Sequence, residues 1–256
     1  MGWLNANGIW IGRNSGSWSP KTQELIDQTV IDLKTALGIT LLSDAFCFLY
    51  LLANEGTEAW RLNLIKRAHD ITQHGGTQTE DGGWQGNGTN AYLDTNFNPA
   101  TQGGTVYTLN NASLGIYSLT NVAETTCDIG CRTTAKDYTA ILSKLADTGG
   151  SSTRMHSGIS SIVDGLVSST IGMFAVGRNA STLTGLHGWV NKIEMEESGS
   201  GESTNIPSAN VFIGARGFSG TPELFSSRKY AFAWGGKYFT HEQIGLIYDV
   251  LVSSWL

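Results

Sequence analysis

Two tryptophans stand beside glycine-rich turns, a setting in which an aromatic ring can meet a ligand. They are Trp84 and Trp189. The C–H faces of sugars are apolar and stack on such rings, and tryptophans also anchor protein interfaces. We therefore predict that Trp84 and Trp189 contact a glycan or a protein partner. The alternative, that an aromatic strand residue fills the core, is the one we expect for Tyr92, Tyr230 and Trp234.

The carboxylates with the most suggestive spacing lie in the run 194–197, Glu-Met-Glu-Glu. On a strand, Glu194 and Glu196 would point to one face about 6.6 Å apart. Two closely spaced carboxylates are the apparatus of retaining glycoside hydrolysis. The run adjoins the Ser-Gly turn 198–201, however, which favours a solvated strand edge. No catalytic residue is assigned, and we predict that the chain is not an enzyme.

Other polar residues form no recognisable reactive site. Asp94 and Asn96 offer two oxygen ligands, which is too few for a calcium ion. The histidines are dispersed, and the sequence has no nucleotide-binding or nucleophile motif. We predict no metal and no cofactor. The three cysteines, Cys47, Cys127 and Cys131, are expected to be reduced, because the last two would lie too far apart on one strand to pair.

The elements that must position these residues are mostly short strands. Of 256 residues, 32 are glycine and only 15% are charged, which suits a loop-rich β protein. Strands without intervening helices indicate antiparallel sheets packed face to face. Helical spacing after Ser19-Pro20, and a capping box formed by Thr240 and Gln243, predict one helix near each end. The predicted fold is an all-β antiparallel β-sandwich with short amphipathic helices near both ends.

Charge and hydropathy exclude two classes of partner. The net charge is -6 and the basic residues are scattered, so nucleic-acid binding is not expected. No apolar run approaches the roughly 20 residues that a membrane-spanning helix needs, so no membrane partner is expected. The amino terminus lacks a basic and then apolar leader, which predicts a protein made in the cytoplasm.

Several stretches together resemble a known family. They are residues 83–99 (GWQGNGTNAYLDTNFNP), the hairpin 190–192 (VNK), 205–216 (NIPSANVFIGAR), 228–236 (RKYAFAWGG) and the closing helix 240–251 (THEQIGLIYDVL). Their order and spacing resemble concanavalin A-like, laminin-G-like jelly rolls, which are common in tailed-phage virion proteins. The resemblance covers roughly residues 40–256.

The resemblance implies a non-enzymatic virion structural protein, an accessory head decoration, fibre or tail component that acts through protein contacts. An alternative is a carbohydrate-binding module that recognises host surface glycans. A third is a glucanase-like hydrolase, although Met195 stands where the glucanase pattern has an aspartate.

The expected organisation has three parts. Residues 1–18 form an arm in which Trp3, Trp10 and Trp18 dock on an assembly, residues 19–38 form a helix, and residues 39–256 form the jelly-roll domain. The expected partners are other virion proteins, further copies of this chain and a host glycan. The expected location is the virion.

Overall fold

The computed structural model describes most of the chain from the first helix onward. The described residues are 3–4, 10–11, 20–54, 59–66, 68–146, 149–157, 161–195, 197–198 and 201–256. Trp3 and Trp10 belong to β1 (Trp3–Leu4) and β2 (Trp10–Ile11), whose backbones pair antiparallel. Trp18 lies outside the described residues. The docking role of the arm stays a prediction.

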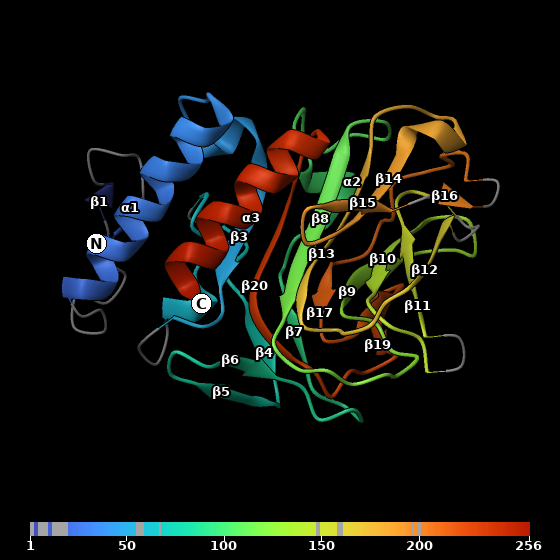
Figure 1. The fold of residues 1–256 in the computed structure, drawn as a ribbon, viewed down its shortest axis with the longest axis horizontal. Coiled ribbons are helices and arrows are strands. Elements are labelled where there is room, and N and C mark those ends of the chain that lie inside the picture. The colour runs from blue at the N-terminus through green and yellow to red at the C-terminus, as the bar shows by residue number, and fades with distance from the viewer. Residues whose placement is uncertain are drawn as a thin grey trace.

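The described chain forms three layers, which are a pair of helices, a central sheet and an outer sheet (Figure 1). The predicted antiparallel β-sandwich with a helix near each end is confirmed. The helices are α1 (Pro20–Leu37) and α3 (His241–Trp255), with a short α2 (Pro99–Gln102) and the 3-10 turns η1 (Leu42–Asp44), η2 (Ala59–Arg61) and η3 (Leu183–Gly185) in loops.

The central sheet has eight strands. Its order is β15 (Ile193–Met195), β14 (Leu186–Val190), β13 (Gly172–Arg178), β8 (Ala112–Ser118), β20 (Lys229–Gly236), β6 (Gly83–Gln85) and β5 (Thr77–Thr79), with β3 (Phe46–Leu51) also paired to β20.

The outer sheet has ten strands. Its order is β16 (Glu197–Ser198), β12 (Ser161–Leu166), β11 (Gly150–Arg154), β10 (Tyr138–Leu142), β9 (Ile129–Arg132), β17 (Phe212–Ile213), β7 (Tyr92–Asp94) and β4 (Thr72–His74). A hairpin of β18 (Arg216–Phe218) and β19 (Thr221–Glu223) is attached to it through a parallel pairing of β18 with β9.

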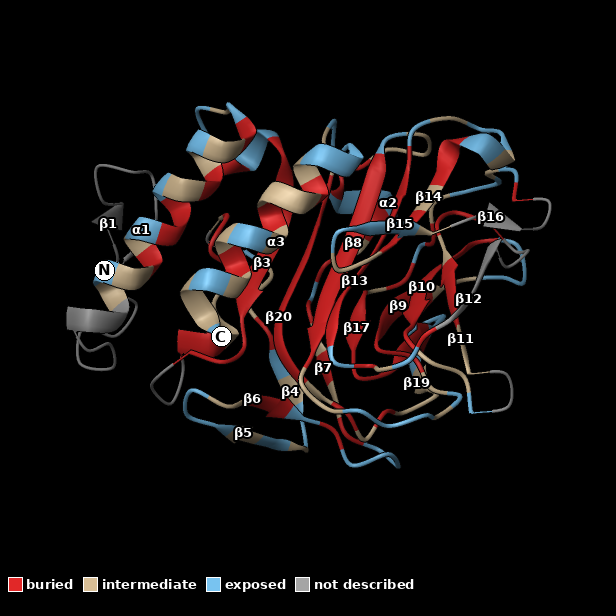
Figure 2. Cartoon of the chain, viewed as in Figure 1, coloured by how far each residue is buried: buried red, intermediate tan, exposed pale blue. Residues whose placement is uncertain are grey.

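The central sheet is buried on both faces, as the continuous red of its middle strands shows (Figure 2). In β13, Phe174 and Val176 pack between the two sheets, whereas Met173 and Ala175 pack toward the helices. Because alternate residues of a strand point to opposite faces, a strand covered twice must be apolar at every position. This explains why β3, β8, β13 and β20 have apolar runs without polar alternation.

The two helices cover the free face of the central sheet and pack against each other (Figure 1). Helix α3 starts with the predicted capping box, in which Thr240 and Gln243 bond each other's backbone N–H groups. The buried faces recur every three or four residues, as amphipathic helices require. They consist of Ile26, Val30, Leu33 and Leu37 in α1 and Ile244, Ile247 and Leu251 in α3. No helix within the described ranges is long and apolar enough to cross a membrane.

A buried ion pair joins the two sheets. Arg228, next to β20, places Nη1 2.9 Å from Oδ1 of Asp128, next to β9. The hydroxyl of Tyr230 donates to the same carboxylate oxygen at 2.8 Å. Both charged side chains are fully buried. The pair therefore fixes how β20 lies against the outer sheet.

The outer face of the outer sheet is not covered by a helix. The β18–β19 hairpin crosses part of it, with a turn at Ser219 (φ 49°) and Gly220 (φ 85°). Gly214, which precedes the hairpin, has φ 74°, and a Cβ there would lie 2.6 Å from the ring of Trp84. Only glycine fits this position, because it needs both positive φ and close approach. The hairpin thereby places its side chains over the strands β9 and β10.

Candidate binding site

The indole of Trp84 is a core residue in the structure. It is 0% exposed and stacks on Tyr230 with ring centroids 6.4 Å apart. A Cβ at Gly76 would lie 2.5 Å from its ring, and Gly214 is similarly close. The neighbouring glycines that indicated an exposed turn instead make room for a buried indole.

Trp189 is also 0% exposed. It packs on the helix side of the central sheet, between His187 at 5.8 Å and Tyr238 at 6.2 Å. A fully buried ring presents no face to a glycan or a partner, so the structure argues against Trp84 and Trp189 as surface contacts. The site has to be sought among other residues.

The three aromatic residues assigned to the core divide into two groups. Tyr230 and Trp234 are fully buried, as predicted. Tyr92 is half-buried on the outer face, where it stacks on His74 with centroids 4.4 Å apart and contacts Phe212 at 4.7 Å. The inward residue of β7 is Leu93, so the strand alternation turns Tyr92 outward.

Glu194 bonds histidines in the structure. Its Oε1 lies 2.7 Å from Nδ1 of His187, and its Oε2 lies 3.5 Å from Nδ1 of His241 at the start of α3. Glu196 lies outside the described residues. Glu194 therefore links β15 to β14 and α3, which fits a strand edge tied to a helix.

The predicted oxygen pair of Asp94 and Asn96 is used internally. Asp94 accepts from Nδ2 of Asn210 at 3.1 Å and from the backbone N–H of Asn96 at 2.7 Å. Over the part of the chain that the structure describes, no three His, Cys, Asp or Glu side chains gather as metal ligands would. These contacts fasten the loop after β7 to the strand before β17.

The three cysteines are free and buried. Cys131 packs between the sheets, whereas Cys127 packs with Tyr138 on the outer side, so the two do not share a face as the strand pattern predicted. The reason is that β9 begins only at Ile129, so Cys127 lies outside the regular alternation. Burial raises the pKa of the Cys47 thiol to about 11 and that of the other two still further, which leaves them unreactive.

The outer face carries a cluster of cationic and aromatic side chains. We call Arg132, Tyr138, Arg154, Arg216 and Phe218 the arginine platform. The guanidinium carbons of its three arginines lie 5.6, 4.5 and 4.6 Å from the centre of the Tyr138 ring, in that order. The guanidinium of Arg132 also lies 5.0 Å from the ring of Phe218. Cations at these distances are attracted by the ring faces.

Sheet register brings the members of the arginine platform together. Arg132 of β9 pairs with Tyr138 of β10, and Arg154 of β11 pairs with Ala140, two residues further along β10. The two arginines therefore reach Tyr138 from neighbouring strands on opposite sides. Phe218 of the hairpin lies beside Arg132. Since Ile129, Cys131 and Ile141 point into the core, the alternate residues point to the outer face.

Arg216 is the fixed member of the platform. Its Nη1 donates to the hydroxyl of Tyr138 at 2.5 Å, and its Nε donates to Oε1 of Glu223 at 2.7 Å. Burial raises the pKa of Tyr138 to about 12, so the phenol stays neutral and accepts the bond. Burial lowers the pKa of Arg154, Tyr138 opposes this, and the charges of Arg216 and Arg132 lower it further. The platform is thus a site of mutual repulsion between cations.

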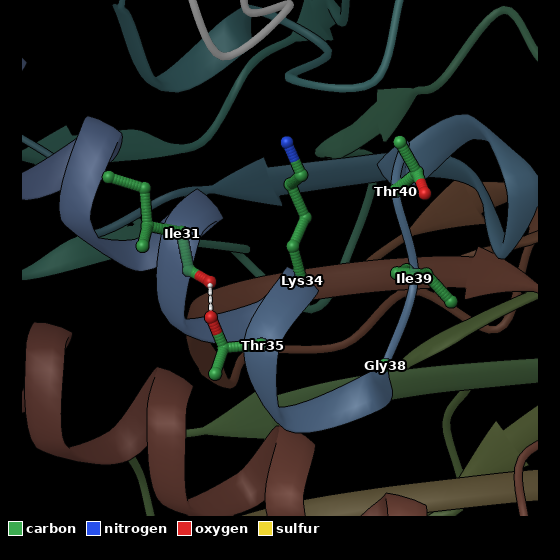
Figure 3. A pocket seen from close by; sticks show the side chains of 6 residues that line it. All are labelled: Ile31, Lys34, Thr35, Gly38, Ile39 and Thr40. Carbon is green, nitrogen blue, oxygen red and sulfur yellow. Dashed lines mark hydrogen bonds between the residues drawn. The ribbon is translucent and has the colours of Figure 1, made fainter.

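Two cavities lie elsewhere on the described surface. The larger, about 420 Å³, opens at the carboxyl end of α1 (Figure 3). Its lining has no aromatic ring, and Figure 3 shows Thr35 already bonded to the carbonyl of Ile31. The other, about 290 Å³, lies beside the exposed Ile171 and Ile193 at the edge of the central sheet. Neither cavity combines an aromatic face with converging donors as the arginine platform does.

Comparison with known proteins identifies the fold. No protein-family model matches the sequence, and no curated protein matches it. Among solved structures, a Trypanosoma rangeli sialidase mutant displaying trans-sialidase activity matches with TM-score 0.58 and 11% identity over 90% of this chain. The T. rangeli sialidase in complex with sialic acid matches with TM-score 0.57 and 10% identity over 96%. At this identity the likeness shows the fold alone.

The chain spans only 39% and 43% of the length of these two structures. The comparison corrects two predictions. The role of a non-enzymatic virion structural protein is wrong, as is the assignment of the chain as unrelated to enzymes, because the structures that share its fold are sialidases. The virion motif resemblance misled because one sandwich fold carries many functions. The predicted homo-oligomer, virion partners and virion location were not tested by the comparison.

Proposed function

We propose that this chain is a carbohydrate-binding β-sandwich of the concanavalin A-like kind, and that the arginine platform is its glycan site. The single observation that carries the proposal is Phe218, which is 38% exposed on the uncovered outer face beside the Arg132 guanidinium. An aromatic face flanked by fixed hydrogen-bond donors suits a sugar, whose rings have apolar faces and hydroxyl edges.

Two further findings support a carbohydrate role. Structures of this fold are sialidases, and one of them is bound to sialic acid. The platform also stands on strands whose other face is in the core, so its side chains are held on rigid elements. Sites built on sheets keep their geometry better than sites on loops. The donors of Arg132, Arg154 and Arg216 can therefore bond sugar hydroxyls without large reorganisation.

The test is a glycan array followed by calorimetry on the full chain. We expect a saccharide to bind, and we expect Phe218→Ala to weaken its binding about tenfold, because the stacking face is lost. Ile193→Ala is the matched control, since it removes another exposed apolar side chain, 72% exposed, at the edge of the central sheet. Failure of the array to show any binding, or equal losses in both variants, would refute the proposal.

A further inference from the structure

The three arginines reach the arginine platform from three different directions. Arg132 comes from β9 and Arg154 from β11, on either side of Tyr138 in β10. Arg216 comes from the hairpin strand β18. All three guanidiniums lie within 5.6 Å of the centre of one ring. In a chain of net charge -6, this is a local concentration of positive charge against the overall balance.

The arginines are not equivalent. Arg216 is buried and bonds both Tyr138 and Glu223, so it holds the phenol in place. Arg132 and Arg154 are half-exposed, and each stacks on an aromatic face. Stacking leaves the edge of a planar guanidinium, where its N–H donors lie, directed away from the ring. Arg132 and Arg154 are therefore the pair that can donate to a ligand.

We propose that the arginine platform recognises a carboxylate on the glycan, held between Arg132 and Arg154 while the sugar ring stacks on Phe218. The inference rests on the proposed carbohydrate function and specifies the class of sugar. A guanidinium fork matches a carboxylate with two parallel bonds. A neutral sugar leaves the repulsion among the arginines in place, whereas a bound anion relieves it.

A nucleic acid is a poor fit to the same charges. Phosphate-backbone binding needs basic side chains along a stripe and a favourable overall field. Here the cations converge on one ring and the whole chain is acidic. A single planar anion on a small sugar matches this arrangement, so the ligand is an acidic saccharide.

The experiment compares three oligosaccharides of equal length by calorimetry. They are a uronic-acid oligomer, the same oligomer with its carboxyls reduced to alcohols, and a sulfated neutral oligomer. We expect the carboxylate form to bind about tenfold or more tightly than the reduced form, because two charge-assisted bonds are lost on reduction. Arg132→Gln and Arg154→Gln should each weaken the carboxylate form about tenfold and leave the reduced form unchanged.

Lys192→Gln is the matched control. It removes an exposed cation that pairs with Asp249 of α3, away from the outer sheet. We expect it to bind all three saccharides as the unmodified chain does, with thermal melts confirming that every variant is folded. Equal affinity for the carboxylate and reduced forms, or a preference for the sulfated form, would overturn the inference.

The failure of this inference and the failure of the proposed function give different results. If the reduced form binds as tightly as the acid form and Phe218→Ala weakens both, the platform is a sugar site that ignores charge, and only the inference falls. If none of the three saccharides binds and the array is also blank, the carbohydrate function itself falls, and the inference with it.

Discussion

Arg228 and the arginine platform differ in what surrounds each guanidinium. Arg228 is fully buried, and all three of its nitrogens donate, to Asp128 and to backbone carbonyls that include those of Val122 and Lys144. Burial lowers its pKa, but the charge of Asp128 together with Tyr230 and Glu124 outweighs this and raises it. In the platform, Arg132 and Arg154 instead face aromatic rings and one another's charge.

The difference shows which arginines hold the fold and which are available for a ligand. A buried cation must have a carboxylate and a complete set of hydrogen bonds, because desolvation costs several kcal/mol. A half-exposed cation can rely on water and on ring faces, so it keeps bonding capacity for a ligand. We expect the first kind to control stability and the second kind to control binding.

Replacing Arg228 should have the largest effect on stability. We expect Arg228→Met to lower the free energy of unfolding by about 3–5 kcal/mol, because Asp128 is left buried without its cation. Urea denaturation followed by tryptophan fluorescence measures this. The double variant with Asp128→Leu should recover part of the loss, since no unpaired charge then remains. A cost below about 1 kcal/mol for the single variant would mean that the pair contributes little.

His156 tests the case of a buried base with no counter-charge. It is fully buried, and its Nδ1 lies 2.7 Å from the carbonyl of Leu109. Burial lowers its pKa from 6.5 to about 4, and the charge of Arg178 also lowers it. Since the unfolded chain binds the proton more readily, stability is complete above pH 6.5 and is lost as the pH falls toward 4.

The expected loss from His156 across this window is about 3 kcal/mol. Urea denaturation at half-unit pH steps from 7 to 4 measures it. His156→Asn is the matched variant, because asparagine tolerates the positive φ of 58° and its amide can donate to Leu109. The variant should show a flatter dependence on pH. If both proteins lose stability in parallel, other groups cause the acid sensitivity.

Local rules predicted the helices and the sandwich, because the signals for them lie in neighbouring residues. The capping box of Thr240 and Gln243 is three residues wide, and strand runs such as Phe46–Leu51 are short. Burial is harder to predict because it depends on packing partners. Trp84 was misjudged since the glycines beside it, with Gly214 far along the chain, make a cavity for its ring.

The arginine platform was missed for a related reason. Arg132, Arg154 and Arg216 are far apart in the sequence, and only the pairing of β9, β10 and β11 and the β18 hairpin brings them to one ring. The usable signal was the alternation itself. In the outer strands each arginine stands at a position where an apolar residue would have been expected if the outer face had been covered.

The smallest expected effect on stability belongs to Arg132. Arg132→Gln loses the stacking on Phe218 and Tyr138, worth about 0.5–1 kcal/mol at exposed sites, and also removes repulsion with Arg154. These terms offset each other, so the free energy of unfolding should change by no more than about 0.5 kcal/mol. Added salt separates them, because it screens repulsion between exposed charges and leaves ring packing intact. Between low and high salt, wild type should therefore gain stability relative to the variant, whereas the deficit of Arg228→Met should hardly change. A salt-independent Arg132→Gln difference would mean that the platform cations do not repel one another, and with that the reason for an anionic ligand would be lost.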